Sequence, residues 1–386
     1  MHATTVLSRC AAGLAVGLAA VAGLSPAAAD PAPQAPQTGA VFNDPDGSTD
    51  EQYAIRDYVR TLVDDAAEGS TVSMSIYNIT DFDADFADAL VDAAERGVHT
   101  RIVLESTAAA GTPSGQAIID GLGTDTTADS WASVCTAGCH GTRHNHNKFY
   151  LFSDVNGVEN VVVQSSANFT VSNGSRYWNN AVTFTEHSAL YETYLDYFYD
   201  LARDVEDPDY YSTSSLGDVK TYFFPRAGSS SATDTVYNTL DNVTCTGNSE
   251  VGTADGRTII RVAMWYFGRE PVAERLAELG AEGCEVQIAY TDMLPGPESV
   301  LAGAPNVTMV QLPDEDGQNI IHSKYMLIEG TYAGVADRPV VFTGSPNYSD
   351  AALRLNDEAM LRIYDDAIHS QYVDNFEDIW ASAAAQ

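Results

Sequence analysis

The chain has 386 residues, and its 19 lysines and arginines against 54 aspartates and glutamates give a formal net charge of −35. Because affinity for phosphate backbones comes mostly from lysine and arginine, this balance argues against a general polyanion binder. A local basic pocket in an acidic surface stays compatible with it, and acidic surfaces also keep exported proteins soluble. The length is ample for a buried core and exceeds the usual size of one domain.

The first 29 residues have the pattern of a secretory signal peptide. Arg9 precedes an apolar, small-residue run over 11–24, and the alanines at 27–29 form a suitable cleavage site. The run is too short and too weakly flanked for a membrane span. We therefore predict a secreted protein, with a Pro- and Ala-rich disordered leader over residues 30–41.

The first lobe is predicted to cover residues 42–212. Apolar residues recur with helical spacing over 55–62 and again over 86–94, and Gly97 should end the second of these helices. Strands are predicted on either side of that helix, at Val72–Tyr77 and Thr100–Leu104. A β-α-β unit of this kind favours parallel pairing of its strands.

The second lobe, residues 213–386, repeats the unit. Strands are predicted at Ile259–Tyr266 and Glu285–Tyr290, and the helix between them should stop at Gly280. The remaining predictions are a helix over 190–205, a linker over 207–217 and a C-terminal helix over 365–384.

Four cysteines follow the predicted signal peptide, and an even number in an exported chain suggests disulfides. Three pairings are possible, and we favour Cys135–Cys139 with Cys245–Cys284 because each bond then stays inside one lobe. A zinc site at Cys135, Cys139 and His140 is the competing interpretation, but no second ligand pair lies near it in the sequence.

The acidic run Asp81–Asp85 resembles the start of a calcium loop. The sixth position of such a loop needs glycine, and Phe86 stands there instead. We therefore expect an acidic first turn, which is favourable at a helix N-terminus, and no metal ion or other cofactor.

The most informative feature is a short pattern that occurs twice. His-x-Lys stands at 146–148 and again at 322–324, and these two copies contain two of the three lysines of the chain. Each copy leads into two apolar runs and then into a small polar turn that ends in Asn168 or Asn347. The histidines are 176 residues apart and the asparagines 179, which indicates an internal duplication.

At these positions the chain resembles the phospholipase D superfamily, whose mark is a twice-occurring His-x-Lys-x-x-x-x-Asp followed by Gly-Ser-x-Asn. The resemblance covers nearly all of the chain after the signal peptide. Ser153 and Glu329 stand where the family has aspartate, and Ser165 where it has glycine. The resemblance implies an α/β fold of two pseudo-twofold-related lobes, each a mixed, mostly parallel sheet flanked by helices.

The spacing within the pattern has a physical meaning. Residues i and i+2 of a strand point to the same face, so each histidine projects together with its lysine. Two imidazoles, two point charges that suit phosphate and two amides would then share one pocket between the lobes. If the pattern has only a structural role, the histidines are polar ends of core strands and the lysines are solvated, but this does not explain two matching copies. The residues predicted to carry the chemistry are His146, Lys148, Asn168, His322, Lys324 and Asn347.

The resemblance also implies roles. One imidazole attacks phosphorus and forms a phosphohistidine, and the other protonates the leaving alkoxide and then activates water. By resemblance to two-lobed members, His146 is the nucleophile and His322 the acid. The family often orients a histidine with a downstream carboxylate. Glu358 fits, whereas the first-lobe counterpart 178–180 is Trp-Asn-Asn, so we expect the lobes to differ in role. Supporting contacts to the substrate are expected from Ser166, Ser345 and His144.

Three functions are compatible with this pattern. The first is a secreted, metal-independent phospholipase D that acts on phospholipids at a membrane or micelle surface and leaves phosphatidic acid. The second is a secreted endonuclease with the same chemistry, which the net charge disfavours. The third is a non-catalytic module that binds phosphate esters, motivated by Ser153 and the missing first-lobe carboxylate. Because both motifs lie in one chain, we expect a monomer.

Overall fold

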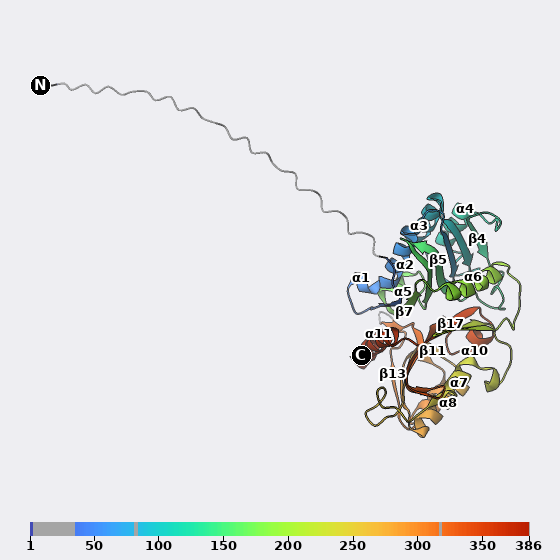
Figure 1. The fold of residues 1–386 in the computed structure, drawn as a ribbon, viewed down its shortest axis with the longest axis vertical. Helices are drawn as coiled ribbons and strands as arrows, with labels where there is room; N and C mark the ends of the chain where they lie inside the picture. Colours follow the sequence, from blue (N-terminus) through green and yellow to red (C-terminus); the bar gives the residue numbers. More distant parts are fainter. Residues whose placement is uncertain (3–34, 81–83, 316–318, 386) are drawn as a thin grey trace. The chain divides into compact units, whose positions relative to one another are not determined.

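The computed structural model describes residues 1–2, 35–80, 84–315 and 319–385 (Figure 1). The predicted signal peptide, apart from its first two residues, lies outside the described residues, as do 81–83 of the acidic run. Within the described part, the chain from Ala35 onward forms one compact unit. No helix in that part is long and apolar enough to cross a membrane.

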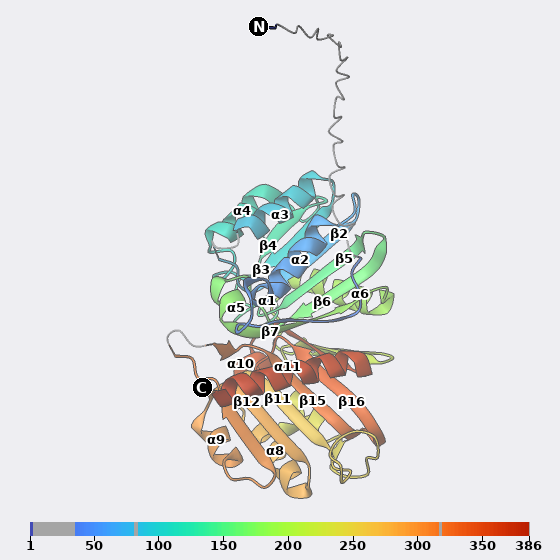
Figure 2. The same ribbon diagram turned by 90° about the vertical axis from the view of Figure 1, so that its left-hand side faces the viewer.

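Two β-sheets, one from each half of the chain, form the framework (Figures 1 and 2). In spatial order the strands of the first sheet are β1 (Gly39–Asn43), β7 (Tyr177–Phe184), β6 (Val158–Ser165), β5 (Lys148–Val155), β2 (Thr71–Ile76), β3 (His99–Leu104) and β4 (Trp131–Val134), and β14 (Ile320–Ile321) adds to β7. Those of the second are β13 (Val307–Gln311), β12 (Glu285–Met293), β11 (Ile259–Phe267), β15 (Lys324–Tyr332), β16 (Val335–Gly344), β17 (Glu358–Ile363), β9 (Val219–Phe224) and β8 (Ser212–Leu216), and β10 (Val243–Thr244) adds to β15.

The two sheets share one strand order. β7-β6-β5-β2-β3-β4 of the first corresponds to β17-β16-β15-β11-β12-β13 of the second, with the His-x-Lys lysine opening the third strand of each series. The structure therefore confirms the predicted two-lobed α/β fold. The predicted linker over 207–217 is wrong in part, because β8 forms a hairpin with β9 through Gly217, which has φ +74°. The leader expected over 30–41 is also too long, since β1 begins at Gly39 and pairs with β7.

The prediction of mostly parallel sheets is wrong. β2, β3 and β4 pair in parallel as expected, as do β11, β12 and β13, but the other strands on the main path of each sheet pair antiparallel. The cause is local. Asn156 and Gly157 join β5 to β6 with φ of +53° and +82°, the backbone of a two-residue hairpin, and Ala333 and Gly334 join β15 to β16 in the same way.

Helices cover both faces of the sheets. They are α1 (Thr49–Gln52), α2 (Ala54–Asp64), α3 (Ala84–Glu95), α4 (Pro113–Leu122), α5 (Val171–Ser175), α6 (Ser188–Ala202), α7 (Thr235–Leu240), α8 (Glu270–Glu282), α9 (Pro295–Leu301), α10 (Asp350–Arg354) and α11 (Asp366–Ala385), with a 3-10 turn at Ser231–Thr233. The predicted stop at Gly280 is wrong, because α8 runs on to Glu282 and ends at Gly283, where φ is +107°. Gly280 is instead a packing position, since a Cβ there would lie 2.3 Å from the carbonyl oxygen of Pro305.

The core between the sheets joins the two lobes. It gathers α6, α11 and the facing side chains of both sheets, and Figure 2 shows α11 running across the strands of the second sheet where the lobes meet. Tyr194 and Tyr372 are fully buried in this core, and their hydroxyls lie 3.0 Å from Gln164 Oε1 and 3.1 Å from Thr343 Oγ1. Burial of a large apolar side chain contributes about 1.5–3 kcal/mol, so a shared core of this size fixes the lobes against each other.

Both favoured disulfides are present, Cys135–Cys139 and Cys245–Cys284. The first closes the loop that leads into the first His-x-Lys copy, and the second ties the start of the second lobe to β12. The zinc interpretation is wrong for this cysteine pair, because both thiols are used in the bond.

Candidate active site

Each His-x-Lys copy docks on the opposite lobe. The backbone N–H of His146 donates to the carbonyl oxygen of Asp357, and that of His322 donates to the carbonyl oxygen of Trp178, both at 2.9 Å. β14, just before His322, pairs in parallel with β7 of the first sheet, and a bridge between Asn145 and Asp357 is its counterpart. The duplication therefore brings the two copies together at the junction of the lobes, and each receives its partners from the other lobe.

His146 is oriented by a carboxylate. Its Nδ1 lies 2.8 Å from Oε2 of Glu358, which is fully buried and accepts a second hydrogen bond at Oε1 from Asn356. A carboxylate accepts at this distance, so we place the proton on Nδ1, which leaves the Nε2 lone pair free. Burial raises the pKa of Glu358 to about 7, against the opposing effect of Lys148. Glu358 comes from the other lobe, so His146 has a carboxylate partner although Ser153 stands where the family has aspartate.

His322 is oriented by an amide. Its Nδ1 lies 2.9 Å from Oδ1 of Asn179, which also accepts from Ser166 Oγ at 2.9 Å. The amide nitrogen of Asn179 donates to the carbonyl oxygen of Asn173 at 3.0 Å, which fixes the orientation of the amide. Asn179 lies two residues before the β7 residue that pairs with Ser165, and Glu358 two residues before the β17 residue that pairs with Gly344. The two histidines therefore have equivalent partners that differ in charge.

The lysines lie beneath the histidines. Lys148 Nζ donates to the carbonyl oxygen of His146 at 2.7 Å, and Lys324 Nζ donates likewise to that of His322. Each ammonium also lies over an aromatic ring, 4.6 Å from the centroid of Tyr77 and 5.4 Å from that of Trp265 respectively. Burial lowers the pKa of Lys148 to about 7 and that of Lys324 well below its ordinary value. An ammonium has three donors, so each lysine keeps hydrogen-bonding capacity for a phosphoryl oxygen.

The same environment sets the charge state of the rings. Burial, and after it the positive charges of Lys148 and Lys324, lower the pKa of both His146 and His322 well below the ordinary value. Both imidazoles are therefore free bases at neutral pH while no anion is bound. A phosphodiester monoanion beside them would favour their protonated forms and raise these pKa values.

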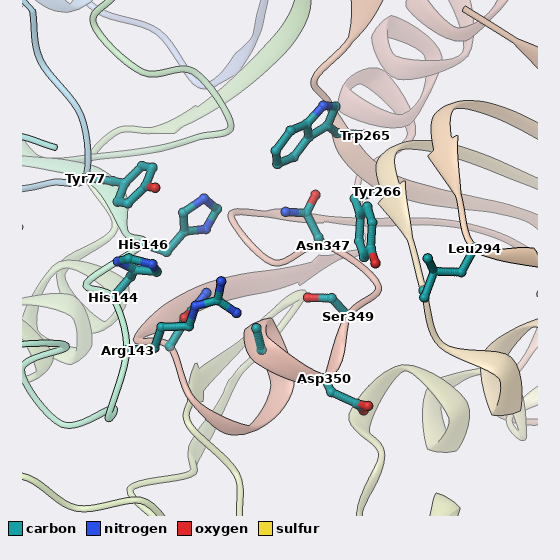
Figure 3. A pocket seen from close by; sticks show the side chains of 13 residues that line it. Tyr77, Arg143, His144, His146, Trp265, Tyr266, Leu294, Asn347, Ser349 and Asp350 are labelled. Atoms are coloured by element: carbon teal, nitrogen blue, oxygen red, sulfur yellow. The ribbon is translucent and has the colours of Figure 1, made fainter. Parts of the chain in front are cut away.

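A pocket of about 450 Å³, within the usual range for small-molecule sites, opens at His146, whereas His322 and the two lysines are not among the residues that line it (Figure 3). Figure 3 shows His146 and Asn347 on its wall, together with aromatic rings from both lobes, Tyr77 and Trp265. His144 lines the pocket, with its Nδ1 3.1 Å from Oε1 of Glu105, and its contact with the substrate stays a prediction. The pocket therefore combines polar groups and aromatic walls.

The remaining predicted residues are placed differently. Asn168 lines a smaller neighbouring cavity, and its Oδ1, like that of Asn347, is buried without a hydrogen-bond partner in the described part of the chain. Ser166 and Ser345 are fully buried, and their hydroxyls bond to Asn179 and to the backbone of Ala359. The prediction of substrate contact by these two serines is therefore wrong, and they position the histidine partners instead.

Sequence reasoning missed three kinds of residue. Tyr77 and Trp265 face the lysines from matching strands, but aromatic residues at strand ends carry no distinctive signal. Asp357 carries no signal of its own in the sequence, yet its buried carboxylate accepts backbone N–H bonds from Cys139, His140 and Gly141 and so docks the disulfide loop. The pairing of Asn179 with His322 could have been inferred from the alignment of Trp178-Asn179 with Asp357-Glu358.

Comparison with known proteins gives three findings. A family model described as cardiolipin synthase, PLD-like domain, matches residues 60–202 and 254–380. The crystal structure of phosphatidylserine synthase from Haemophilus influenzae superposes with a TM-score of 0.58 at 15% identity, over 89% of this chain and 88% of that one. Polyphosphate kinase from Porphyromonas gingivalis gives 0.56 at 13% identity over 88% of this chain, which spans 50% of that protein. No match is found among curated protein sequences.

Proposed function

The chain belongs to the phospholipase D superfamily, and on that premise we propose that it cleaves phosphodiesters through a covalent phosphohistidine on His146. The observation that carries the proposal is the convergence of both His-x-Lys copies at the lobe junction, where a pocket lined by His146 and by residues of both lobes opens. The groups gathered there are two imidazoles, two ammonium groups and amides, a set suited to general acid–base and nucleophilic catalysis on a phosphoryl group. No metal ion takes part in the proposed steps.

The first step exchanges one bond for another at phosphorus. The Nε2 lone pair of His146 forms the P–N bond while the bond from phosphorus to the leaving oxygen breaks, and Nε2–H of His322 gives its proton to that oxygen. In the second step water attacks phosphorus, His322 accepts a proton from the water, and the P–N bond breaks with its electrons returning to Nε2. Lys148 and Lys324 stabilise the charge on the phosphoryl oxygens throughout.

The partners of the two rings support this division of roles. A phosphohistidine that keeps its Nδ1 proton carries positive charge on the ring, and the carboxylate of Glu358 at 2.8 Å stabilises that charge. The amide of Asn179 offers His322 no such charge, so the protonation of His322 responds to the bound phosphate. A ring whose proton affinity changes during the reaction suits an acid that later acts as a base.

For the substrate we propose a phospholipid whose head group is released to leave phosphatidic acid. The family model is described for cardiolipin synthase, and one similar structure is a phosphatidylserine synthase, so lipid phosphodiesters are the chemistry of both names. Tyr266 and Leu294 extend the apolar wall of the pocket toward the exposed surface, where an acyl chain could lie. The two disulfides support export to an oxidising compartment, and we propose a monomer.

The test uses mixed phosphatidylcholine and phosphatidylethanolamine vesicles with EDTA and a little ethanol, for the wild type and His146→Ala. We expect phosphatidylethanol from the wild type alone, because ethanol can replace water in the second step. Absence of any lipid product from folded wild type would contradict the lipid substrate. Nicking of supercoiled plasmid in EDTA, lost in His146→Ala, would then show an endonuclease with the same chemistry.

The neutral amide of Asn179 beside His322 leads to a separate prediction about the pH dependence of activity. In Asn179→Asp a carboxylate would face Nδ1 of His322 and raise its pKa, typically by about 1–3 units for a neighbouring opposite charge. Because the first step needs His322 protonated, activity falls as pH rises through its pKa, and a higher pKa moves this limb to higher pH. We expect the alkaline limb of kcat/KM to shift upward by about one unit.

The control for this shift is a substrate with a weakly basic leaving group, which does not need a proton. With it the alkaline limb of Asn179→Asp and the wild type should coincide. An equal shift with both substrates would mean that Asn179 acts through another group. An alkaline limb that stays unchanged with both substrates would mean that Asn179 does not influence His322 as the acid.

A further inference from the structure

The second lobe has a cationic pocket away from the His-x-Lys copies. It has a volume of about 360 Å³ and shares none of its lining residues with the pocket at the lobe junction. Lys220, Arg226 and Arg362 line it, beside Tyr211 and Tyr222. Lys220 is the one lysine that the duplicated motif does not use. No acidic side chain lines the pocket, although the chain has 54 acidic and 19 basic residues.

The register of two strands places like charges together. Lys220 on β9 stands directly opposite Arg362 on β17 in an antiparallel pair. Like charges in this arrangement destabilise a sheet. Arg362 also lowers the pKa of Lys220, as a second cause after burial. The pair is therefore not explained by the stability of the sheet.

These cations have no acidic counter-ion in the described part of the chain. The ion pairs found there involve other arginines, and Lys220, Arg226 and Arg362 take part in none of them. Arg226 donates to Thr235 Oγ1 at 3.1 Å, whereas Nε of Arg362 is buried with no hydrogen-bond partner among the described residues. The charged groups are thus held in place without being neutralised.

Aromatic rings hold them instead. Lys220 Nζ lies 4.8 Å from the ring centroid of Tyr222, the guanidinium of Arg226 4.4 Å from that of Tyr211, and that of Arg362 4.2 Å from that of Tyr364. A ring restrains a cation through its face while leaving N–H donors at the edge of the guanidinium free. The donors are therefore ordered before any ligand arrives.

We propose that this pocket binds the dianionic phosphate of a phosphate monoester. Two guanidinium groups and one ammonium match a tetrahedral oxyanion, and two negative charges offset most of the local positive charge. A phosphodiester carries one negative charge and would bind more weakly. The proposal concerns a site outside the lobe junction and does not depend on the proposed reaction.

The small number of lysines gives a direct test. Lys148 and Lys324 are 1% and 3% exposed, so acylation of the folded protein by a water-soluble acetylating reagent should report mainly on Lys220. The rate at Lys220 is measured by mass spectrometry with inorganic phosphate or glycerol 3-phosphate, with chloride keeping the ionic strength constant. At a ligand concentration of four times Kd, we expect acetylation to slow about fivefold. Dimethyl phosphate, a diester, should protect less.

The matched variant is Arg226→Gln with Arg362→Gln, which keeps the reporting lysine. We expect protection by phosphate to disappear in it and to persist in Arg60→Gln, which replaces a partly exposed arginine of the first lobe that pairs with Asp64. His146→Ala should retain protection, which separates this site from the lobe junction. Should the double variant fail to fold, the wild-type measurement still decides, because a Lys220 that stays equally reactive with every phosphate monoester, soluble or in vesicles, overturns the proposal.

Two further arms of the acetylation experiment distinguish a soluble phosphate compound from a lipid head group as the ligand. Vesicles of phosphatidylcholine containing phosphatidic acid are compared with vesicles of phosphatidylcholine alone. Protection by soluble monoesters identifies a site for free phosphate compounds, and protection by phosphatidic acid vesicles alone identifies a lipid head group. Absence of protection in every arm contradicts the proposal.

Discussion

Replacement of His146 by alanine is expected to lower kcat on a phosphodiester by about 10⁴-fold or more, as removal of a catalytic nucleophile commonly does. The variant lacks the atom that forms the P–N bond, so only direct attack by water remains. Glu358, Lys148 and the second copy stay in place, so KM should change little. The measurement is kcat and KM on a chromogenic phosphodiester, with His99→Ala, a histidine at the start of β3, as the control.

Trapping of the covalent intermediate tests the same role of His146 without kinetics. Wild type quenched in denaturant during turnover of a labelled diester should carry label on His146, in a bond that acid cleaves and base does not. The label should be absent from His146→Ala. Labelling at His322 in the wild type would reverse the proposed roles. If His146→Ala kept more than about one hundredth of the wild-type activity, His146 would not be the nucleophile.

The duplication could be predicted from the sequence because the repetition of a pattern is itself the signal. His-x-Lys at equal offsets and asparagines at equal distances need no knowledge of packing. The hairpins were missed although Asn156-Gly157 is a strong local turn signal, because the β-α-β pattern that precedes them suggests parallel pairing. The predicted helix stop at Gly280 is wrong because a glycine needed for close approach to Pro305 looks the same in sequence as a glycine that ends a helix.

The partners of the histidines show the limit of the same reasoning. The family resemblance identified Glu358 as an orienting carboxylate, but which ring it faces depends on how each motif crosses to the other lobe. That crossing is set by long-range contacts such as the pairing of β14 with β7, which have no local pattern. The burial of Ser166 and Ser345 was missed for the same reason, since a serine beside a motif asparagine suggests a ligand contact until the neighbouring strand is placed.

The acid role of His322 predicts a loss that depends on the leaving group. For an alkoxide, His322→Ala should lower kcat/KM by about 10²–10⁴-fold, because the leaving oxygen departs without a proton. For a weakly basic phenolate, which departs without protonation, kcat/KM should stay within about tenfold of wild type. Lys324 bonds to the backbone carbonyl of residue 322 and not to the ring, so the substitution leaves this contact in place.

The second step of the reaction tests whether His322 also acts as a base, in addition to its role as an acid in the first step. Without His322 no ring accepts the proton of the attacking water, so the phosphohistidine on His146 should accumulate with the phenolate substrate. A rapid-quench experiment should then show a burst of about one phenolate per enzyme followed by slow turnover, as expected when breakdown of a covalent intermediate is rate-limiting. Equal losses with both leaving groups and no burst would mean that His322 positions the phosphate without transferring a proton. The amide of Asn179 would then serve that positioning, and the difference between the two histidine partners would have no part in the division of the reaction.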